Sequence, residues 1–571
     1  MSQLLADLAA HSGAGARRSA GGRRRWLLAG LVGSVALILA GCGSSKLNSA
    51  SAAGSSSGAT TVPPAGTPVA GGSLSYAVDE PEDSLDPAVS PADVTALIDR
   101  NIFDSLVVQT GANSFGPWLA TSWTVSPNGE IYTFQLKQGV SFQDGTPFNA
   151  AAVVTSLNHV VAASTKSQYA AALIAPYESS DAVGPYTVQI NLKTPFSPFL
   201  QALSTAYLGI QSPAELAKPA SEYVPVGTGP YKYVAWNQNQ NVILQAAATY
   251  SSSPSNASHT GPAYIPKLTF DFISEDATRY GALTSGQVQG IADVPPIDVT
   301  SLEKTSGYYI QTDQSPGDNY NLYLNVKNGA FTNLDVRQAF VESINVPALI
   351  KSIYFGQYKA ATNPLGPTTA FYDPAAKVPA YDQANAERLL AEAGYGKVDS
   401  AGYRVNSAGQ ELTVIWPYDS DYNREERNVL GDGIVAEAKQ VGIKIDRPSV
   451  DQSQFISDLE SGGYGLFDDS FVRGSADILR YSFTVPFEQG GQDFSQENDP
   501  QLDAWLNGAA QTSDAATQQQ DYDQAQQYVL QNAVVLPLYV EQYRMGASDK
   551  LHGITFDAQA FPLFYGAWLS S

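Results

Sequence analysis

Two late segments of the chain combine aromatic rings with carboxylates, a pattern that suits ligand binding. The first covers residues 416–421 and the second covers residues 464–477. Aromatic faces beside acids can hold a sugar ring or a cation, whereas an extended peptide is held mainly through its backbone. The candidate ligand-contacting side chains in these segments are Trp416, Tyr418, Asp421, Phe471, Arg473 and Asp477.

Several of these residues have a structural interpretation beside the functional one. Trp416 directly follows an apolar stretch, residues 412–415, and could equally belong to the core. Phe471 has the same two interpretations, as part of a cleft wall or as part of the core. Arg473 could bind an anion or pair with a neighbouring aspartate, and we favour the pairing.

The sequence shows no arrangement typical of catalysis or metal binding. It contains no Gly-x-Ser-x-Gly motif, and its four histidines are scattered along the chain. A nucleophilic triad needs a positioned base, so a secreted hydrolase with paired acids is kept only as a minor alternative. A chain with one cysteine cannot form an intrachain disulfide or a thiolate metal cage. We therefore expect a non-enzymatic protein without a metal or cofactor.

The single cysteine, Cys42, ends an export signal. Arginines within residues 17–25 form a basic region, and residues 26–40 carry no charge. This order is typical of a signal peptide, and the uncharged stretch is short for a permanent transmembrane helix. The segment Leu39-Ala40-Gly41-Cys42 resembles the bacterial lipobox, in which the cysteine is acylated and becomes the first mature residue. We expect a signal peptide over residues 1–41 and a lipid on Cys42, with general secretion and twin-arginine export both open.

Length and composition bound the rest of the chain. With 571 residues and a formal charge of −23, the protein is too long for one core and too acidic to attract nucleic acid. Residues 42–70 are mostly small and polar, and we expect them to form a flexible tether. The membrane would then hold the folded part only through the lipid.

Short strands alternate with helices along the folded part, which predicts an α/β fold. An Asn-Gly pair at residues 128–129 predicts a hairpin around it. The predicted strands cover residues 72–78, 121–125, 131–136 and 443–445. The predicted helices cover residues 92–107, 150–161 and 428–440.

An ordered series of motifs resembles the family 5 extracytoplasmic solute-binding proteins of peptide and nickel ABC importers. Among these motifs are Asp83-Ser84-Leu85-Asp86-Pro87, Phe142-Gln143-Asp144-Gly145-Thr146-Pro147-Phe148, Pro225-Val226-Gly227-Thr228-Gly229-Pro230-Tyr231 and Val441-Gly442-Ile443-Lys444. The resemblance implies a two-lobed periplasmic-binding-protein-like fold (type II, cluster C) whose lobes are joined by a hinge. It places lobe I at residues 71–312 with 541–571 and lobe II at residues 313–540.

The resemblance also indicates where a solute would bind. Family members that take dipeptides clamp the ammonium with an aspartate and the carboxylate with an arginine. Gly474 stands at the aspartate's place, and Ser420 or Asp421 stands at the arginine's place. A buried carboxylate without a partner is costly, so a dipeptide held at both ends is disfavoured. Glu82 and Asp86 lie in the loop after the first strand, where family members approach the ligand.

These observations predict a lipid-anchored receptor on the outer face of the cytoplasmic membrane. It would capture a small solute, with peptides favoured, close around it, and deliver it as a monomer to an ABC permease with its ATPase. Oligosaccharides or metal chelates are alternative solutes, and a ligand sensor on the same fold is an alternative role.

Overall fold

The strand that opens the folded part, β1 (Ser73–Val78), lies inside a seven-stranded mixed sheet. The computed structural model describes residues 62, 66–419, 424–486 and 491–571, which fall within one compact unit, Gly58–Ser571. Cys42, the signal peptide predicted for residues 1–41, most of the tether and Asp421 lie outside the described residues. Leu74, Tyr76 and Val78 of β1 are buried, because the strand has neighbours on both edges and a packed core against it.

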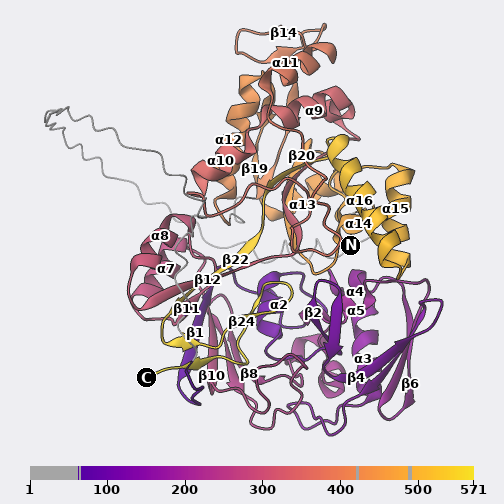
Figure 1. Ribbon diagram of the computed structural model, residues 1–571, viewed down its shortest axis with the longest axis vertical. Helices are drawn as coiled ribbons and strands as arrows, with labels where there is room; N and C mark the ends of the chain where they lie inside the picture. The colour runs from indigo at the N-terminus through magenta and orange to yellow at the C-terminus, as the bar shows by residue number, and fades with distance from the viewer. Residues whose placement is uncertain (1–61, 63–65, 420–423, 487–490) are drawn as a thin grey trace, which may run out of the picture. The chain divides into compact units, whose positions relative to one another are not determined.

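In the large sheet, β1 pairs in parallel with β10 and β11, and the other pairings are antiparallel. Figure 1 shows β1, β10 and β8 in one region of the ribbon. In spatial order the strands are β12 (Tyr308–Gln314), β22 (Gln542–Ser548), β11 (Gly290–Ile291), β1, β10 (Lys267–Phe272), β9 (Asn241–Ala246) and β8 (Tyr231–Asn237).

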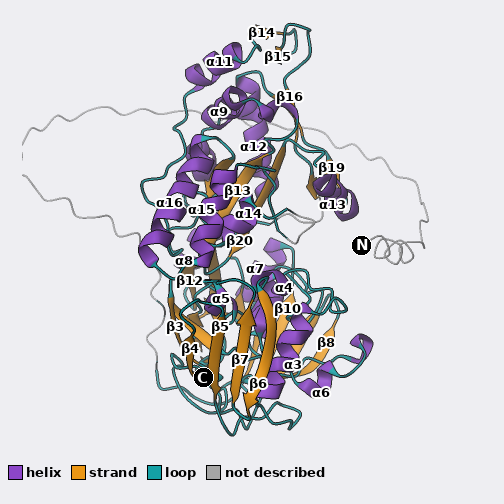
Figure 2. Ribbon diagram, turned by 90° about the vertical axis from the view of Figure 1, so that its right-hand side faces the viewer, coloured by secondary structure: helices purple, strands orange, loops and turns teal. Residues whose placement is uncertain are grey.

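A four-stranded antiparallel sheet contains the predicted hairpin. Its strands in spatial order are β4 (Ala120–Val125), β5 (Ile131–Leu136), β7 (Thr187–Leu192) and β6 (Tyr177–Gly184). The β4–β5 hairpin is confirmed, and Gly129 takes the left-handed conformation in its turn with φ of 73°. Helix α3 (Ala150–Val161) is confirmed with its predicted bounds, and it packs on β6 and β7 (Figure 2).

A three-stranded antiparallel sheet has the order β20 (Leu466–Val472), β13 (Gly317–Leu324) and β21 (Val535–Tyr539). Every residue of β13 is buried. The chain passes twice between this sheet and the large one, from β12 to β13 and from β21 to β22. At the first passage Gly317 has φ of 105°, and a Cβ there would lie 2.1 Å from the Phe471 carbonyl oxygen, so the passage requires glycine.

Short two-stranded sheets complete the β structure. They pair β2 (Val107–Gly111) with β3 (Ser114–Pro117), β14 (Lys397–Val398) with β15 (Arg404–Val405), β16 (Thr413–Ile415) with β18 (Lys444–Asp446), β17 (Tyr418–Asp419) with β19 (Ser449–Val450), β23 (Leu551–His552) with β26 (Trp568–Leu569), and β24 (Thr555–Phe556) with β25 (Pro562–Leu563). The predicted strand at residues 443–445 is confirmed as β18, shifted by one residue.

One predicted helix, over residues 92–107, is much shorter than expected. The structure has α2 over Asp93–Asp99, and residue 107 already belongs to β2. The side-chain amide of Asn101 donates to the carbonyl oxygens of Leu97 and Ile98, which competes with continuation of the helix. The apolar residues beyond Asn101 have a spacing that also fits a helix. In the structure they pack into the core from a turn.

The remaining helices surround these sheets. Helix α12 (Arg427–Gln440) confirms the predicted late helix within one residue. Figures 1 and 2 both show α15 and α16 side by side. The others are α4 (Ala170–Leu173), α5 (Phe199–Ala202), α6 (Pro213–Leu216), α7 (Asp276–Thr284), α8 (Pro296–Lys304), α9 (Leu334–Ser343), α10 (Val346–Ile353), α11 (Gln383–Glu392), α13 (Gln452–Ser461), α14 (Ile478–Phe483), α15 (Pro500–Gln511) and α16 (Ala515–Gln531).

Among the described residues, no helix has both the length and the apolar character that a membrane span requires.

Candidate functional site

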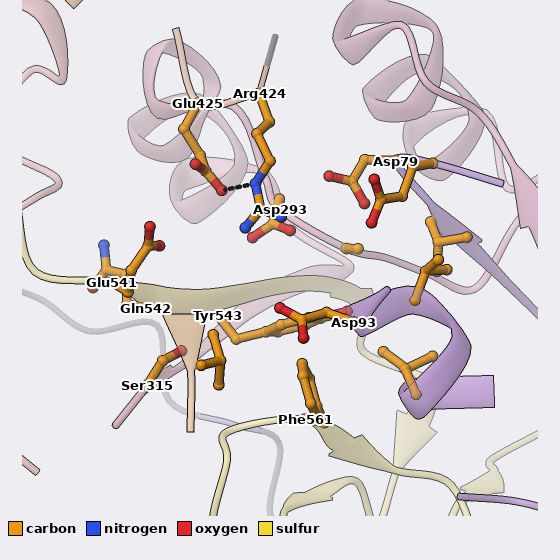
Figure 3. Close-up of a pocket in the computed structure, with 16 residues that line it drawn as sticks. Asp79, Asp93, Asp293, Ser315, Arg424, Glu425, Glu541, Gln542, Tyr543 and Phe561 are labelled. Carbon is orange, nitrogen blue, oxygen red and sulfur yellow. Dashed lines mark hydrogen bonds and ion pairs between the residues drawn. The ribbon is translucent and has the colours of Figure 1, made fainter. Parts of the chain in front are cut away.

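A small pocket collects carboxylates from segments that are far apart in sequence (Figure 3). We call it the acidic pocket. Its charged lining residues are Asp79, Glu80, Asp93, Asp293, Arg424, Glu425 and Glu541. Tyr543 and Phe561 give it an apolar wall, and in Figure 3 both rings lie near Asp93. Carboxylates therefore outnumber the guanidinium, which makes the pocket suited to a cation.

The ends of regular elements place these acids. Asp79 and Glu80 directly follow β1, and Asp93 is the first residue of α2. Glu541 lies in the passage from β21 to β22. Asp293 has a positive φ of 43°, a conformation that a residue other than glycine seldom adopts. The pocket thus forms where the segments that follow β1 and β11, the passage from β21 to β22 and the start of α2 meet.

Arg424 and Glu425 enter the pocket just before α12. Glu425 and Glu426 both have left-handed backbone conformations, with φ of 47° and 56°. Such conformations cost about 1 kcal/mol or more each, and they persist where surrounding contacts impose them. Arg424 Nε donates to Glu425 Oε1 at 2.9 Å, the interaction drawn in Figure 3.

Arg427 anchors this segment from behind the pocket. Its guanidinium lies 2.8 Å from Glu425 and 2.9 Å from Glu541, and it stacks 4.1 Å over the ring of Tyr320. The Tyr539 hydroxyl also donates to Glu425, at 2.8 Å. Burial opposes ionisation of Glu425, but Arg424 and Arg427 outweigh it and lower the pKa of Glu425 to about 2. Glu425 is therefore a fixed negative charge.

Two other acids of the pocket behave differently. Burial, reinforced by the neighbouring Asp79, raises the pKa of Glu80 to about 8. The same two causes raise the pKa of Asp293 to about 8. Both carboxyls therefore hold protons near neutral pH when no cation is present. A cation that enters the pocket would favour their ionised forms.

A second cavity opens onto the same acids. It is larger than the acidic pocket and shares Asp79, Glu80, Asp293, Arg424 and Glu425 with it. Arg279 also lines it, but its guanidinium is bound to Asp276 at 2.7 Å and to backbone carbonyl oxygens. The acidic pocket therefore continues into a larger space that could admit a solute.

Arg473 lines a separate small cavity, which we call the Arg473 pocket. Its other polar or aromatic lining residues are Tyr169, Phe196, Gln201, Ser475, Asp477, Arg480 and Tyr481. The guanidinium stacks 3.9 Å from the centre of the Tyr169 ring and lies 3.5 Å from Asp93. Arg473 therefore pairs at a long distance with Asp93, which is remote in sequence, and not with a neighbouring aspartate.

The structure corrects the prediction for Trp416. Its side chain is fully buried in a hydrophobic core, and its indole N–H donates to Asp468. Arg447 stacks over the rings of both Trp416 and Tyr418. Trp416 lines neither pocket, because it lies on the same face of its extended segment as the buried Leu412 and Val414. Tyr418 is half-buried and also lies outside both pockets.

The second predicted segment is divided between roles. Phe471 is half-buried and packs against the core, and its ring contacts Tyr481. Asp477 lines the Arg473 pocket, but both of its carboxylate oxygens accept from Arg480, at 2.8 and 2.7 Å. A Cβ on Gly474 would lie 2.6 Å from Gln109 Oε1, so an aspartate at this place would have to displace the Gln109 side chain.

Glu82 and Asp86 are buried instead of facing either pocket. Asp86 is bound by His159 at 2.8 Å and by the Gln211 amide at 3.0 Å. Neither oxygen of Glu82 has a hydrogen-bond partner, and burial raises the pKa of Glu82 to about 7. The loop after β1 does reach a pocket, but through Asp79 and Glu80.

Sequence reasoning missed most of the acidic pocket. The acids that follow β1 carried a signal, since Asp79 and Glu80 directly precede Pro81 at the strand end. Arg424 follows the expected arginine position by a few residues, which a gap in the comparison could have revealed. Asp293 and Glu541 carried no signal, because only the tertiary structure brings them beside β1. The described residues contain no group of three or more metal-binding side chains in a metal-binding arrangement.

Comparisons with known proteins agree with this architecture. The model of the family "Bacterial extracellular solute-binding proteins, family 5 Middle" matches residues 114–491. The glutathione-binding protein GsiB of Escherichia coli K12 is 31% identical over 450 residues, which cover 76% of this chain and 82% of that protein.

Solved structures of this kind superpose over most of the chain. NikA from Brucella suis in complex with Fe(III)-EDTA has a TM-score of 0.78 at 24% identity and covers 87% of this chain and 100% of its own. DppA from Helicobacter pylori in complex with the peptide STSA has a TM-score of 0.74 at 25% identity, covering 88% and 99%. The predicted α/β, two-lobed periplasmic-binding-protein-like fold of type II is confirmed. The chain belongs to family 5 of the bacterial extracellular solute-binding proteins, non-enzymatic components of ABC transporters.

Proposed function

We propose that this protein captures a peptide-like solute with a cationic group outside the cytoplasmic membrane and delivers it to an ABC permease. The observation that carries the proposal is the acidic pocket. Arg424 is the one basic residue among the described residues that line it. The acidic lining residues are more numerous and come from several distant segments. The ammonium of a solute would replace the protons that Glu80 and Asp293 hold in the empty pocket.

Two relatives support a peptide-like solute. The name of GsiB states that it binds glutathione, and the DppA structure contains the peptide STSA. The oligosaccharide alternative loses support, because Trp416 lies in the core and cannot stack on a sugar. A wider cavity, lined by Trp118, Tyr250, Gly474 and Tyr565 among others, offers room for further residues of an oligopeptide.

The proposed movement is closure of two lobes around the solute. We assign lobe I to residues 71–312 with 541–571 and lobe II to residues 313–540. Sheet membership supports crossings near these positions, because β12, which ends at Gln314, and β22 belong to the seven-stranded sheet, whereas β13 and β21 belong to the three-stranded one. The connecting residues between these strands would act as the hinge.

The proposed anchor is a lipid on Cys42, after removal of residues 1–41, with residues 42–70 as the tether and the folded part as a monomer. Cys42→Ser should release the protein from membranes into the soluble fraction, as measured by fractionation and immunoblotting. Retention of the variant on membranes after signal cleavage would contradict the anchor.

Thermal unfolding with peptides tests the solute class. The first probes are glutathione and the tetrapeptide Ser-Thr-Ser-Ala, each with a free and an acetylated amino group. A ligand that binds only the folded state stabilises it by about 2.7 kcal/mol at a hundredfold excess over Kd. We expect stabilisation by the free amines and little by the acetylated forms. Equal shifts for both forms, or no shift with any peptide, would contradict the proposal.

A further inference from the structure

Arg473 carries a buried positive charge with few partners. Its side chain is 7% exposed, and its Nε has no hydrogen-bond partner. Gln201 lines the same pocket, is 6% exposed, and has a side-chain nitrogen without a partner. Buried donors are normally satisfied, so two unpartnered donors beside one cavity indicate a missing acceptor.

The neighbouring acids do not supply that acceptor. Asp477 is bound through both oxygens to Arg480. Asp93 lies 3.5 Å from Arg473 Nη1, and the same Asp93 oxygen also accepts from the Tyr207 hydroxyl at 3.0 Å. Arg473 Nη1 donates to the Val472 carbonyl oxygen at 2.7 Å, which neutralises no charge. The guanidinium therefore lacks the close, bidentate carboxylate that such groups usually bind.

We propose that Arg473 and Gln201 form a subsite for a carboxylate of the solute. This inference rests on the proposed function, because it names a second group of the same solute. The guanidinium offers Nε, and the Gln201 amide offers a further N–H. The ring of Tyr169 holds the guanidinium plane from one side.

Asp93 connects this subsite to the acidic pocket, since it lines that pocket and pairs with Arg473. A solute carboxylate would compete with Asp93 for the guanidinium. Asp93 would then be left as an additional negative charge beside the cationic group of the solute. The two pockets together therefore select a solute that carries both charges.

The first experiment uses acetate, a carboxylate without an ammonium. We expect acetate to raise the Tm of the wild-type protein above its value in chloride at equal ionic strength. Arg473→Gln and Gln201→Leu should abolish that difference, and Asp93→Asn should enlarge it. Arg337→Gln is the matched control, because Arg337 is 8% exposed and lies outside the pocket. An acetate effect that is equal in the wild type and in Arg473→Gln would overturn the proposal.

The second experiment compares Ser-Thr-Ser-Ala with its C-terminal amide by calorimetry. The free acid should bind about tenfold more tightly, as expected for a charge-assisted bidentate interaction, and Arg473→Gln should remove the preference. Arg473→Lys should restore part of it. Peptide binding without any preference for the acid would overturn the subsite and leave the proposed function intact. An acetate effect that depends on Arg473, without binding of any peptide, would support the subsite and reject the peptide.

Discussion

The acidic pocket and the Arg473 pocket both hold ionisable groups away from water, but they differ in whether those groups can lose their charge. In the acidic pocket, burial and the neighbouring Asp79 favour the protonated, uncharged forms of Glu80 and Asp293. Arg473 cannot lose its proton, and its nearest carboxylate lies at 3.5 Å. Crowded carboxyls can therefore remain without a bound cation at a modest cost in free energy, because they can be protonated. A buried guanidinium stays charged and is stabilised by a bound anion.

The largest expected effect comes from the cation that is fully paired. Arg427→Met would leave Glu425 and Glu541 buried without their shared partner. Breaking a buried ion pair in this way typically costs about 3 to 5 kcal/mol, and we expect a loss of that size in the free energy of unfolding. Denaturant titration measures it. An equally large loss in the free energy of unfolding for Arg473→Gln would show that Arg473 is as fully paired as Arg427. The difference between the two arginines would then disappear.

Removal of Glu80 and Asp293, the acids with raised pKa values, should weaken the preference for a solute with a free amine. Glu80→Gln together with Asp293→Asn should weaken binding of a free-amine peptide by at least tenfold, since hydrogen bonds to charged groups contribute about 1.5 to 3 kcal/mol each. The acetate effect at Arg473 should remain. Calorimetry and thermal unfolding check the two results. Glu178→Gln, on the exposed side of β6, is the control. Unchanged peptide affinity in the double variant would exclude the acidic pocket as the cation site.

The two pockets should also differ in their response to pH. A carboxyl whose pKa is raised on folding holds more protons in the folded state, so the empty protein loses stability as pH rises from ordinary carboxyl values to about 8. Cation affinity should rise over the same range, by at most about tenfold per pH unit for each proton released. Acetate binding at Arg473 should change little there. Calorimetry in buffers of different ionisation enthalpy measures the released protons, and binding without proton release would contradict protonated Glu80 and Asp293.

The smallest effect is expected outside both pockets. Trp416→Phe removes the indole donor to Asp468 and should reduce the free energy of unfolding by about 1 to 3 kcal/mol, the range for a buried acceptor that loses its partner. Peptide affinity and the acetate effect should stay unchanged. A loss of peptide affinity at full stability would return Trp416 to the binding site.

Local elements were predictable because their signals are local. The hairpin at residues 128–129 depends on an Asn-Gly pair, and α3 has its N-cap in Asn149, whose side chain accepts from the Ala152 N–H at 3.0 Å. The helix predicted to reach residue 107 failed, because Asn101 binds carbonyl oxygens of the preceding turn and long-range packing occupies the apolar residues that follow.

The candidate site was predictable only in part. Arg473 was singled out, and its pairing with an aspartate was favoured, but the partner, Asp93, is 380 residues away in the sequence. Trp416 has the residue type of a cleft wall, yet it shares the buried face of its extended segment with Leu412 and Val414, which places it in the core. Sequence spacing says nothing about which acids from distant segments will share one cavity.

The sequence by itself determined the family and most of the α/β elements, because both depend on residues that are close together in the chain or occur in a characteristic order. Only the tertiary structure decided which charges meet. The acidic pocket exists because β1, the turn at Asp293, the Arg424 segment and the passage at Glu541 converge. The protonation of Glu80 and the unmet hydrogen-bonding capacity of Arg473 follow from that convergence, since burial and neighbouring charge set both.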